Sequence, residues 1–212
     1  MSTIAAPSAP TRRVLADVIA RPSSRARAFA LDAGLVIAGA AVVALLAQVE
    51  IPLWPVPITG QTLGVIVVGA ALGAWRGAAA LTTYLLAGLA GLPVFAGLSG
   101  TVAAVGKPSF GFIIGFVFAA FVAGWFAQRA WDRRPVLAFV GFAAASVVPF
   151  VFGIPYMAFI LNVVMGLDYS LSALLEVGLL PFILGGIVKA ALAAAIIPGA
   201  WGLVRQADDS KR

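Results

Sequence analysis

Residues 110–128 read F-G-F-I-I-G-F-V-F-A-A-F-V-A-G-W-F-A-Q, a run without one charged side chain. About 20 apolar residues in a helix are enough to cross the hydrocarbon core of a bilayer. The run is apolar throughout, whereas the strands of an outer-membrane barrel alternate apolar and polar residues. This stretch therefore predicts a transmembrane α-helix.

The composition of the whole chain agrees with a membrane protein. Of its 212 residues, 62% are apolar and 10% carry a formal charge, against about 25% charged residues in an average soluble domain. So few charges cannot cover a surface that faces water on all sides. We therefore predict an all-α, polytopic membrane protein.

Further apolar runs predict six transmembrane helices, at about residues 31–49, 62–75, 77–91, 110–128, 136–165 and 173–204. Arg76, between the second and third runs, indicates a turn at the membrane surface. Residues 31–204 would form the membrane domain, between a flexible basic leader at 1–30 and a tail at 205–212. Prolines are expected to bend or end the last two helices: Pro149, Pro155, Pro181 and Pro198.

The basic residues fit this topology with both termini in the cytoplasm. Lys107 alone falls in an external segment, and Lys189 falls within the sixth helix. Such a bias toward the cytoplasmic side orients membrane proteins. The other twelve of the fourteen basic residues fall in cytoplasmic segments: Arg12, Arg13, Arg21, Arg25, Arg27, Arg76, Arg129, Arg133, Arg134, Arg205, Lys211 and Arg212.

Several classes of function are disfavoured by what the chain lacks. It contains no His and no Cys, which removes thiol nucleophiles and imidazole or thiolate metal sites. It also lacks a P-loop motif for ATP hydrolysis and an intramembrane series of acids for proton relay. We expect no enzyme activity, no metal, no cofactor and no nucleic-acid partner.

Two external segments are the candidates for a binding site. Residues 50–61 read E-I-P-L-W-P-V-P-I-T-G-Q, and their prolines favour extended backbone. Residues 92–111 are apolar enough to fold into the protein, where Gly97 and Gly100 would let the backbone approach a ligand. An ordinary surface loop is the alternative for this second segment. A lidded pocket with few polar groups suits a small, partly apolar solute.

Lys189 is the sharpest single candidate, because a charge inside an apolar helix is costly and often marks a functional site. Its long stem could instead reach lipid headgroups, so two interpretations stay open. Among the aromatic residues, Tyr84, Phe95 and Tyr156 serve either packing or ligand contact. Ala40 and Ala44, four positions apart, favour close helix packing.

Several stretches of the sequence resemble the motifs of a known family. The most specific stretches are V-P-I-T-G-Q-T-L-G at 56–64 and Y-L-L-A-G-L-A-G-L-P-V-F-A-G at 84–97. L-P-F at 180–182 and K-A-A-L-A-A at 189–194 add a C-terminal signature. From about residue 34 to 198, the chain resembles the BioY family.

The resemblance implies the biotin-capturing S subunit of an energy-coupling factor transporter, a multi-pass protein of a bacterial-type inner (plasma) membrane. It implies biotin as the transported ligand and, as partners besides the surrounding lipids, an energy-coupling transmembrane subunit and two ATPase subunits. Ala40 and Ala44 become candidates for the interface with the coupling subunit. The candidate substrate-binding residues are Lys189, Thr59, Gln61, Tyr84, Phe95, Gly97, Ser99, Gly100 and Tyr156.

The chain departs from the family pattern at two places that help to form the family's ligand site. Gly186 stands where the family usually has an Asp, three positions before Lys189. Residues 106–112 read G-K-P-S-F-G-F where G-P-T-G-G-[YF] is usual. The alternative functions are a stand-alone carrier or channel for another small, partly apolar carboxylate solute, and an integral membrane enzyme or structural assembly protein.

Overall fold

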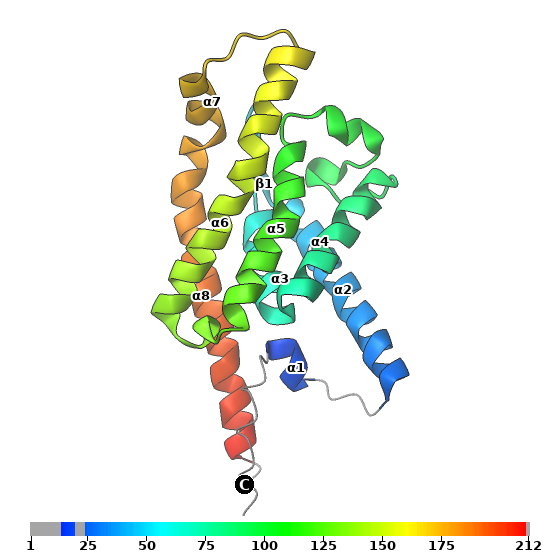
Figure 1. Ribbon diagram of the computed structural model, residues 1–212, viewed down its shortest axis with the longest axis vertical. Helices are drawn as coiled ribbons and strands as arrows, with labels where there is room; N and C mark the ends of the chain where they lie inside the picture. The colour runs from blue at the N-terminus through cyan, green and yellow to red at the C-terminus, as the bar shows by residue number, and fades with distance from the viewer. Residues whose placement is uncertain (1–13, 20–23, 211–212) are drawn as a thin grey trace, which may run out of the picture.

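The computed structural model describes residues 14–19 and 24–210. Several basic residues assigned to the leader and tail, namely Arg12, Arg13, Arg21, Lys211 and Arg212, lie outside the described residues. Within the described residues the chain is a bundle of helices with one short hairpin of strands (Figure 1). This confirms the all-α class predicted from the apolar runs.

The apolar run at 110–128 forms α5 (Phe110–Ala127), which packs against α3, α4 and α6. Figure 1 shows α5 in the middle of the bundle, with α6 and α8 on one side and α4 and α2 on the other. The remaining helices are α2 (Arg25–Ala47), α3 (Gln61–Leu72), α4 (Ala74–Leu89), α6 (Pro135–Ala158), α7 (Leu171–Gly178) and α8 (Leu180–Asp209). Shorter elements are α1 (Leu15–Ile19), β1 (Glu50–Ile51), β2 (Ile58–Thr59), the 3₁₀ turns η1 (Ala96–Leu98), η2 (Val102–Gly106) and η3 (Trp131–Arg133), and the π-helical turn η4 (Phe159–Val164).

Four helical segments of the described chain are long and apolar enough to cross a membrane: Arg25–Ala47, Phe110–Ala127, Pro135–Val164 and Leu171–Ala207. The two other predicted spans are α3 and α4, with 12 and 16 residues. At 1.5 Å per residue each is shorter than the hydrocarbon core, which is about 30 Å thick. The count of six spans therefore stays a prediction, whereas the membrane character of the chain is clear.

The predicted boundaries differ from the observed ones at three points. The predicted sixth helix, 173–204, is interrupted at Leu179 and forms α7 and α8, and α8 continues to Asp209 within the predicted tail. Helix α2 begins at Arg25, so residues 25–30 belong to the bundle and not to the leader. The turn between α3 and α4 falls at Gly73, whose φ of 88° is a conformation that glycine adopts readily. Arg76 consequently lies in the first turn of α4. The prolines Pro149, Pro155 and Pro198 lie inside continuous helices.

Part of the predicted flexible leader is packed against the bundle. Val14 and Leu15 are buried, and Arg76 forms ion pairs with Asp17 at 2.6 Å and with Asp32 at 2.9 Å. The short helix α1 contacts α3 beneath its C-terminal end. Arg76 thus joins α1, α2 and α4 at one end of the bundle.

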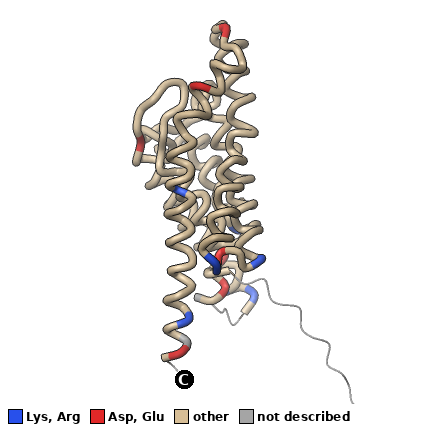
Figure 2. The backbone as a smooth tube through the Cα atoms, turned by 90° about the vertical axis from the view of Figure 1, so that its left-hand side faces the viewer, with Lys and Arg blue, Asp and Glu red and all other residues tan. Residues whose placement is uncertain are grey.

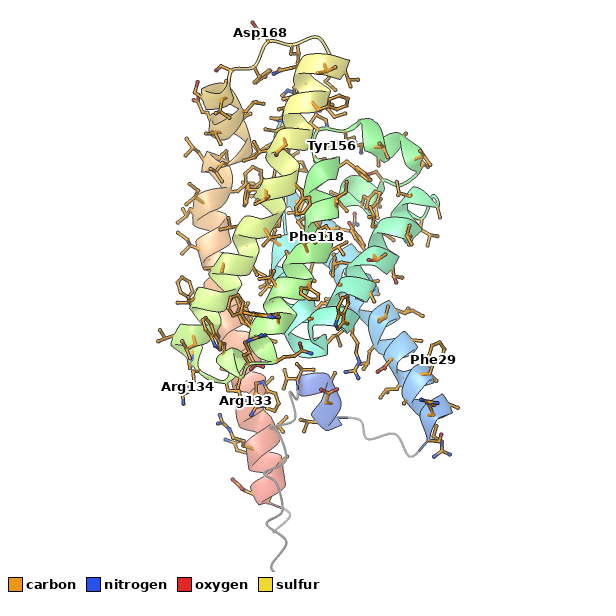
Figure 3. The ribbon with its side chains drawn as sticks, viewed as in Figure 1. Phe29, Phe118, Arg133, Arg134, Tyr156 and Asp168 are labelled. Carbon is orange, nitrogen blue, oxygen red and sulfur yellow. The ribbon has the colours of Figure 1, made fainter. Side chains whose placement is uncertain are left out.

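Most of the described basic residues gather at one end of the molecule. Figure 2 shows basic residues gathered toward the end where the chain terminates. Arg133 and Arg134 lie at that end, and Asp168 lies at the opposite end (Figure 3). The sorting expected from the sequence is therefore present in three dimensions.

A buried carboxylate fixes α8 to the turn between α5 and α6. Asp132, in η3, is fully buried, and its Oδ2 accepts a hydrogen bond of 2.6 Å from the Trp201 indole N–H. The Arg133 guanidinium lies over the Trp201 ring, 4.4 Å from its centroid. Burial raises the pKa of Asp132 from 3.8 to about 6, against the opposing effects of Trp201 and Arg133. The contact holds Trp201 and Arg133 in one arrangement.

Glycines let α5 approach its neighbours closely. A Cβ atom on Gly69 of α3 would lie 2.4 Å from the Ala120 carbonyl oxygen of α5, and one on Gly124 would lie 2.3 Å from the Ala74 nitrogen of α4. Real Cβ atoms do not come this near to backbone. The small residues therefore serve packing inside this chain.

We predict that Gly69→Ala destabilises the bundle, because α3 and α5 must separate to admit the methyl group. Overpacking of this kind costs about 1–3 kcal/mol, which would appear as a lower midpoint of thermal unfolding in detergent. Gly185→Ala in α8 is the matched control, since a Cβ there meets nothing within 4 Å. Equal midpoints for the two variants would contradict the prediction.

Candidate ligand-binding site

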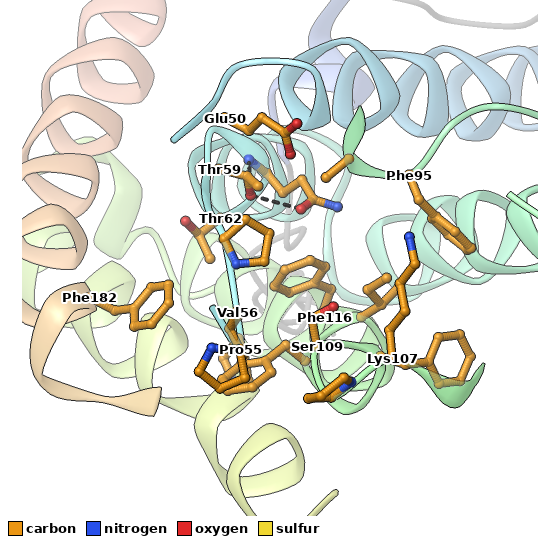
Figure 4. A pocket seen from close by; sticks show the side chains of 18 of the residues that line it. Glu50, Pro55, Val56, Thr59, Thr62, Phe95, Lys107, Ser109, Phe116 and Phe182 are labelled. Atoms are coloured by element: carbon orange, nitrogen blue, oxygen red, sulfur yellow. Dashed lines mark hydrogen bonds between the residues drawn. The ribbon is translucent and has the colours of Figure 1, made fainter. Parts of the chain in front are cut away.

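A cavity of about 320 Å³ lies beneath the 50–60 segment and the loop that follows α4 (Figure 4). This volume is within the range of small-molecule pockets. Part of its wall is aromatic: Phe112 contacts both Phe150 and Phe182, with ring centroids 5.6 and 6.4 Å apart. Residues from α3, α5, α6 and α8 meet here, so a ligand would contact most of the bundle.

The proline-rich segment covers one side of the cavity. Its ends pair as a two-stranded antiparallel ladder, with Glu50 opposite Thr59. The intervening residues are not helical, as the prolines predicted, and Val56 is buried whereas Trp54 is exposed. The Trp54–Pro55 peptide bond is cis. Residues 54–57 all line the cavity.

The loop after α4 is fastened to the bundle by the side chain of Gln48. Its amide nitrogen donates to the Phe95 carbonyl at 3.2 Å, and its amide oxygen accepts from the Leu98 N–H at 2.9 Å. The Phe95 ring is buried against Gly88, where no Cβ could fit, and meets the Tyr84 ring edge-on at 5.4 Å. The start of this loop therefore folds into the protein, while Leu98 stays exposed.

A chain of polar groups runs from the cavity wall into the core. Thr59 Oγ1 donates to Gln61 Oε1 at 2.7 Å (Figure 4). Gln61 Nε2 in turn donates to the Tyr84 hydroxyl at 2.6 Å. Gln61 is 5% exposed and Tyr84 1% exposed. Thr59 and Gln61 line the cavity, and Tyr84 does not. Tyr84 therefore positions the Gln61 amide from behind.

Lys189 points into the bundle. Its ammonium donates to the Thr59 carbonyl at 2.6 Å and to Thr62 Oγ1 at 2.9 Å, and it lines the cavity. The headgroup interpretation is thus not the observed arrangement. Gly186 does not line the cavity, and a Cβ there would meet nothing within 4 Å. Lys189 is held by neutral oxygens at the start of α3.

Lys107 is a lining residue that was not among the sequence candidates. Its ammonium donates to Ser99 Oγ at 3.1 Å, and Ser99 Oγ donates to the Ala96 carbonyl at 2.8 Å. The signal was present in the sequence, because Lys107 is the one basic residue predicted on the outer side. Figure 4 shows Lys107 beside Phe95, away from Thr62 and Phe182. The cavity therefore has two separate cationic groups.

The sequence candidates divide into two groups. Lys189, Thr59, Gln61, Phe95 and Ser99 line the cavity. Tyr84, Gly97, Gly100 and Tyr156 do not line it, and three of them, Tyr84, Gly100 and Tyr156, support its walls instead. Gly100 packs on the Leu92 carbonyl, and the Tyr156 hydroxyl donates to the Val105 carbonyl at 2.5 Å, which holds η2 to α6.

The two alanines expected at a subunit interface face the interior. Ala40 is buried, and Ala44 is half-buried against the same core. The small residues that α2 exposes are Ala26, Ala30, Gly34, Ala38 and Ala41. The choice of Ala40 and Ala44 as a surface pair is therefore corrected, because α3 and α4 pack on their side of the helix.

Among the described residues, no group of acidic side chains is arranged to hold a metal ion.

Comparison with known proteins identifies the family to which this chain belongs. The model of the BioY family matches residues 20–206. The chain belongs to the BioY family. A biotin transporter BioY from Rhizobium etli is 37% identical over 174 residues, covering 79% of this chain and 87% of the relative. A biotin transporter BioY from Thermotoga maritima is 33% identical over 154 residues, covering 71% and 83%.

One solved structure has the same fold. It is a crystal structure of the S-component for biotin from an ECF-type ABC transporter, with a TM-score of 0.61 and 24% identity. The match covers 84% of this chain and 93% of the solved chain. Family membership places the chain among membrane transport proteins and not among enzymes.

We predict that Gln48→Met frees the loop at 94–98. The Gln48 side chain donates to the carbonyls of Val94 and Phe95 and accepts from the Leu98 N–H, and methionine can make none of these hydrogen bonds. Hydrogen exchange measured on peptides from 92–101 should become faster, while peptides from α5 remain protected. Gln206→Met, at an exposed position of α8, is the control. Unchanged exchange in Gln48→Met would show that other contacts hold the loop.

Proposed function

We propose that this protein is the high-affinity subunit that captures biotin and delivers it inward in concert with an energy-coupling ATPase module. The observation that carries the proposal is a largely apolar cavity with polar groups at two separated points, in a chain of the BioY family. The relatives that match this chain over most of their length are named biotin transporters.

Biotin matches the cavity chemically. Its compact bicyclic ring suits the aromatic wall of Phe112, Phe150 and Phe182. Its ureido group needs donors for one carbonyl and acceptors for two N–H groups, which Lys189, Thr59 and Gln61 supply. Its tail ends in a carboxylate, which pairs best with a cation.

The two lysines suggest an orientation for the ligand. Lys107 is exposed and its ammonium donates to the Ser99 hydroxyl, so it suits the carboxylate at the outer end. Lys189 is half-buried and already bonded to neutral oxygens, so it suits the ureido carbonyl. With Gly186 in place of an acid, the ureido N–H groups would find acceptors in Thr59, Gln61 and the carboxylate of Glu50, which all line the cavity. Tyr84, Gly97, Gly100 and Tyr156 would affect binding indirectly, by positioning the residues that line the cavity.

The finer topology belongs to the same proposal. The chain would cross a bacterial-type inner membrane six times, with α3 and α4 as short spans. Both termini would then lie in the cytoplasm, and the gathering of basic residues at that end supports this orientation. The sequence has no P-loop, which fits a division of labour with two ATPase subunits and a transmembrane coupling subunit. The exposed small residues Gly34, Ala38 and Ala41 of α2 would let the coupling subunit approach closely.

A stand-alone carrier for another small carboxylate is the alternative, and the names of the relatives do not favour it.

We expect purified protein to bind biotin saturably, and the two lysines to respond differently to the charge of the ligand. Lys107→Met should weaken biotin about tenfold or more, the worth of a charge-assisted hydrogen bond, but leave binding of biotin methyl ester almost unchanged. Lys189→Met should weaken both ligands. Titration calorimetry with biotin, its methyl ester and unrelated vitamins provides the measurement.

No saturable binding at micromolar biotin would refute the function. Equal losses for both ligands in Lys107→Met would refute only the orientation.

We also expect Ala38→Leu to reduce co-purification of the coupling and ATPase subunits without changing biotin affinity. The larger side chain would hold the partner away from α2. Ala144→Leu, at an exposed position of α6, is the control. Undiminished co-purification in Ala38→Leu would place the interface elsewhere.

A further inference from the structure

A second hollow lies on the surface between α6 and α8, at the end of the bundle that carries Arg133. It is an open groove of about 590 Å³. Arg133 and Arg205 are its charged residues, and no acidic side chain lines it. The remaining lining is apolar and mostly small: Pro135, Phe139, Ala191, Ala194, Ala195, Pro198 and Gly199.

The floor of the groove is open space and not a packing contact. Ala191, Ala195 and Gly199 are exposed on α8, and a Cβ on Gly199 would meet nothing within 4 Å. Both helices belong to segments that are apolar enough to cross a membrane. The outward face of such a helix meets lipid tails, so a long apolar chain is the natural occupant of the floor.

Tryptophans beside two arginines indicate which level of the bundle meets the lipid headgroups. Trp201 is beside the groove, and Arg133 stacks on its ring at 4.4 Å. Just after the end of α5, Arg129 stacks on Trp125 of that helix in the same way, 3.3 Å from the ring centroid. Tryptophans gather at the membrane–water interface, level with the headgroups. A groove that is apolar along its length and doubly cationic at this level complements a lipid with an anionic head.

The position of one arginine is fixed by buried groups. Trp201 donates its indole N–H to Asp132, which is fully buried behind it. Arg133, adjacent to Asp132, is thereby held against the indole. Arg205 is exposed on α8, one turn before Asp209. The cationic end is thus partly organised before any ligand arrives.

We propose that this groove binds one anionic phospholipid, with its phosphate between Arg133 and Arg205 and one acyl chain along the α6–α8 floor. The site is separate from the biotin cavity and does not depend on the proposed function. The expected ligand is a membrane lipid and not a free anion, because a free anion would leave the apolar floor exposed.

Native mass spectrometry of the full chain, released from neutral detergent, tests the site. We expect phosphatidylglycerol to bind more tightly than phosphatidylcholine with the same acyl chains. Arg205→Gln should weaken phosphatidylglycerol about fivefold, the contribution of one basic residue near an anionic headgroup. Arg134→Gln is the matched control, since Arg134 is exposed nearby but does not line the groove.

A second pair of variants tests the apolar floor. Gly199→Leu should fill the groove and abolish the preference for phosphatidylglycerol, whereas Gly202→Leu should preserve it. A Cβ at either glycine meets nothing within 4 Å, so both variants should fold, and thermal unfolding checks this.

Three results would overturn the proposal. The first is equal binding of the two lipids. The second is equal behaviour of Arg205→Gln and Arg134→Gln, or of the two glycine variants. The third is displacement of the lipid by inorganic phosphate at equal concentration, which would indicate a site for a free anion.

Discussion

The ligand cavity depends on the contact between Lys189 and the start of α3. An ammonium in an apolar helix is costly unless it finds oxygen partners. The Thr59 carbonyl and the Thr62 hydroxyl supply them at 2.6 and 2.9 Å, where the proline-rich segment turns into a helix. The bond therefore ties the C-terminal helix to the segment that covers the cavity. A ligand oxygen that reaches the ammonium would compete with this tie.

Much of the fold could be predicted from the sequence, because apolar runs without charge have few other uses. The run at 110–128 became α5 almost residue for residue, and the proline-containing run at 136–165 became α6 with η4. The packing of Val14 and Leu15 could not be predicted, since Asp17 becomes informative only when Arg76 lies near it. The turn between α3 and α4 was predicted at Arg76 and lies at Gly73, because a charged residue is a stronger sign of a membrane boundary than a single glycine.

The site was less predictable, because lining a cavity depends on which face a helix turns inward. Ala40 and Ala44 have the spacing of an interface, but spacing does not say which neighbour is met, and here α3 and α4 meet them. Lys189 allowed two interpretations until its partners, about 130 positions earlier in the chain, were in place. Lys107 was overlooked because it was counted as a topology marker, although a lone external cation beside a pocket is also a candidate for an anion.

The two faces of α8 explain how a single helix can serve two sites. Ala190, Ala193 and Ile197 are buried toward the bundle, and these small or compact side chains let α8 approach α3 closely enough for Lys189 to reach Thr59. Ala191, Ala195 and Gly199 lie on the exposed side, where equally small side chains leave the groove open. A helix of larger residues would fill the groove and also hold Lys189 away from α3. If the groove binds a lipid, the alanine-rich sequence of α8 serves both sites, and substitutions on one face should leave the other site intact.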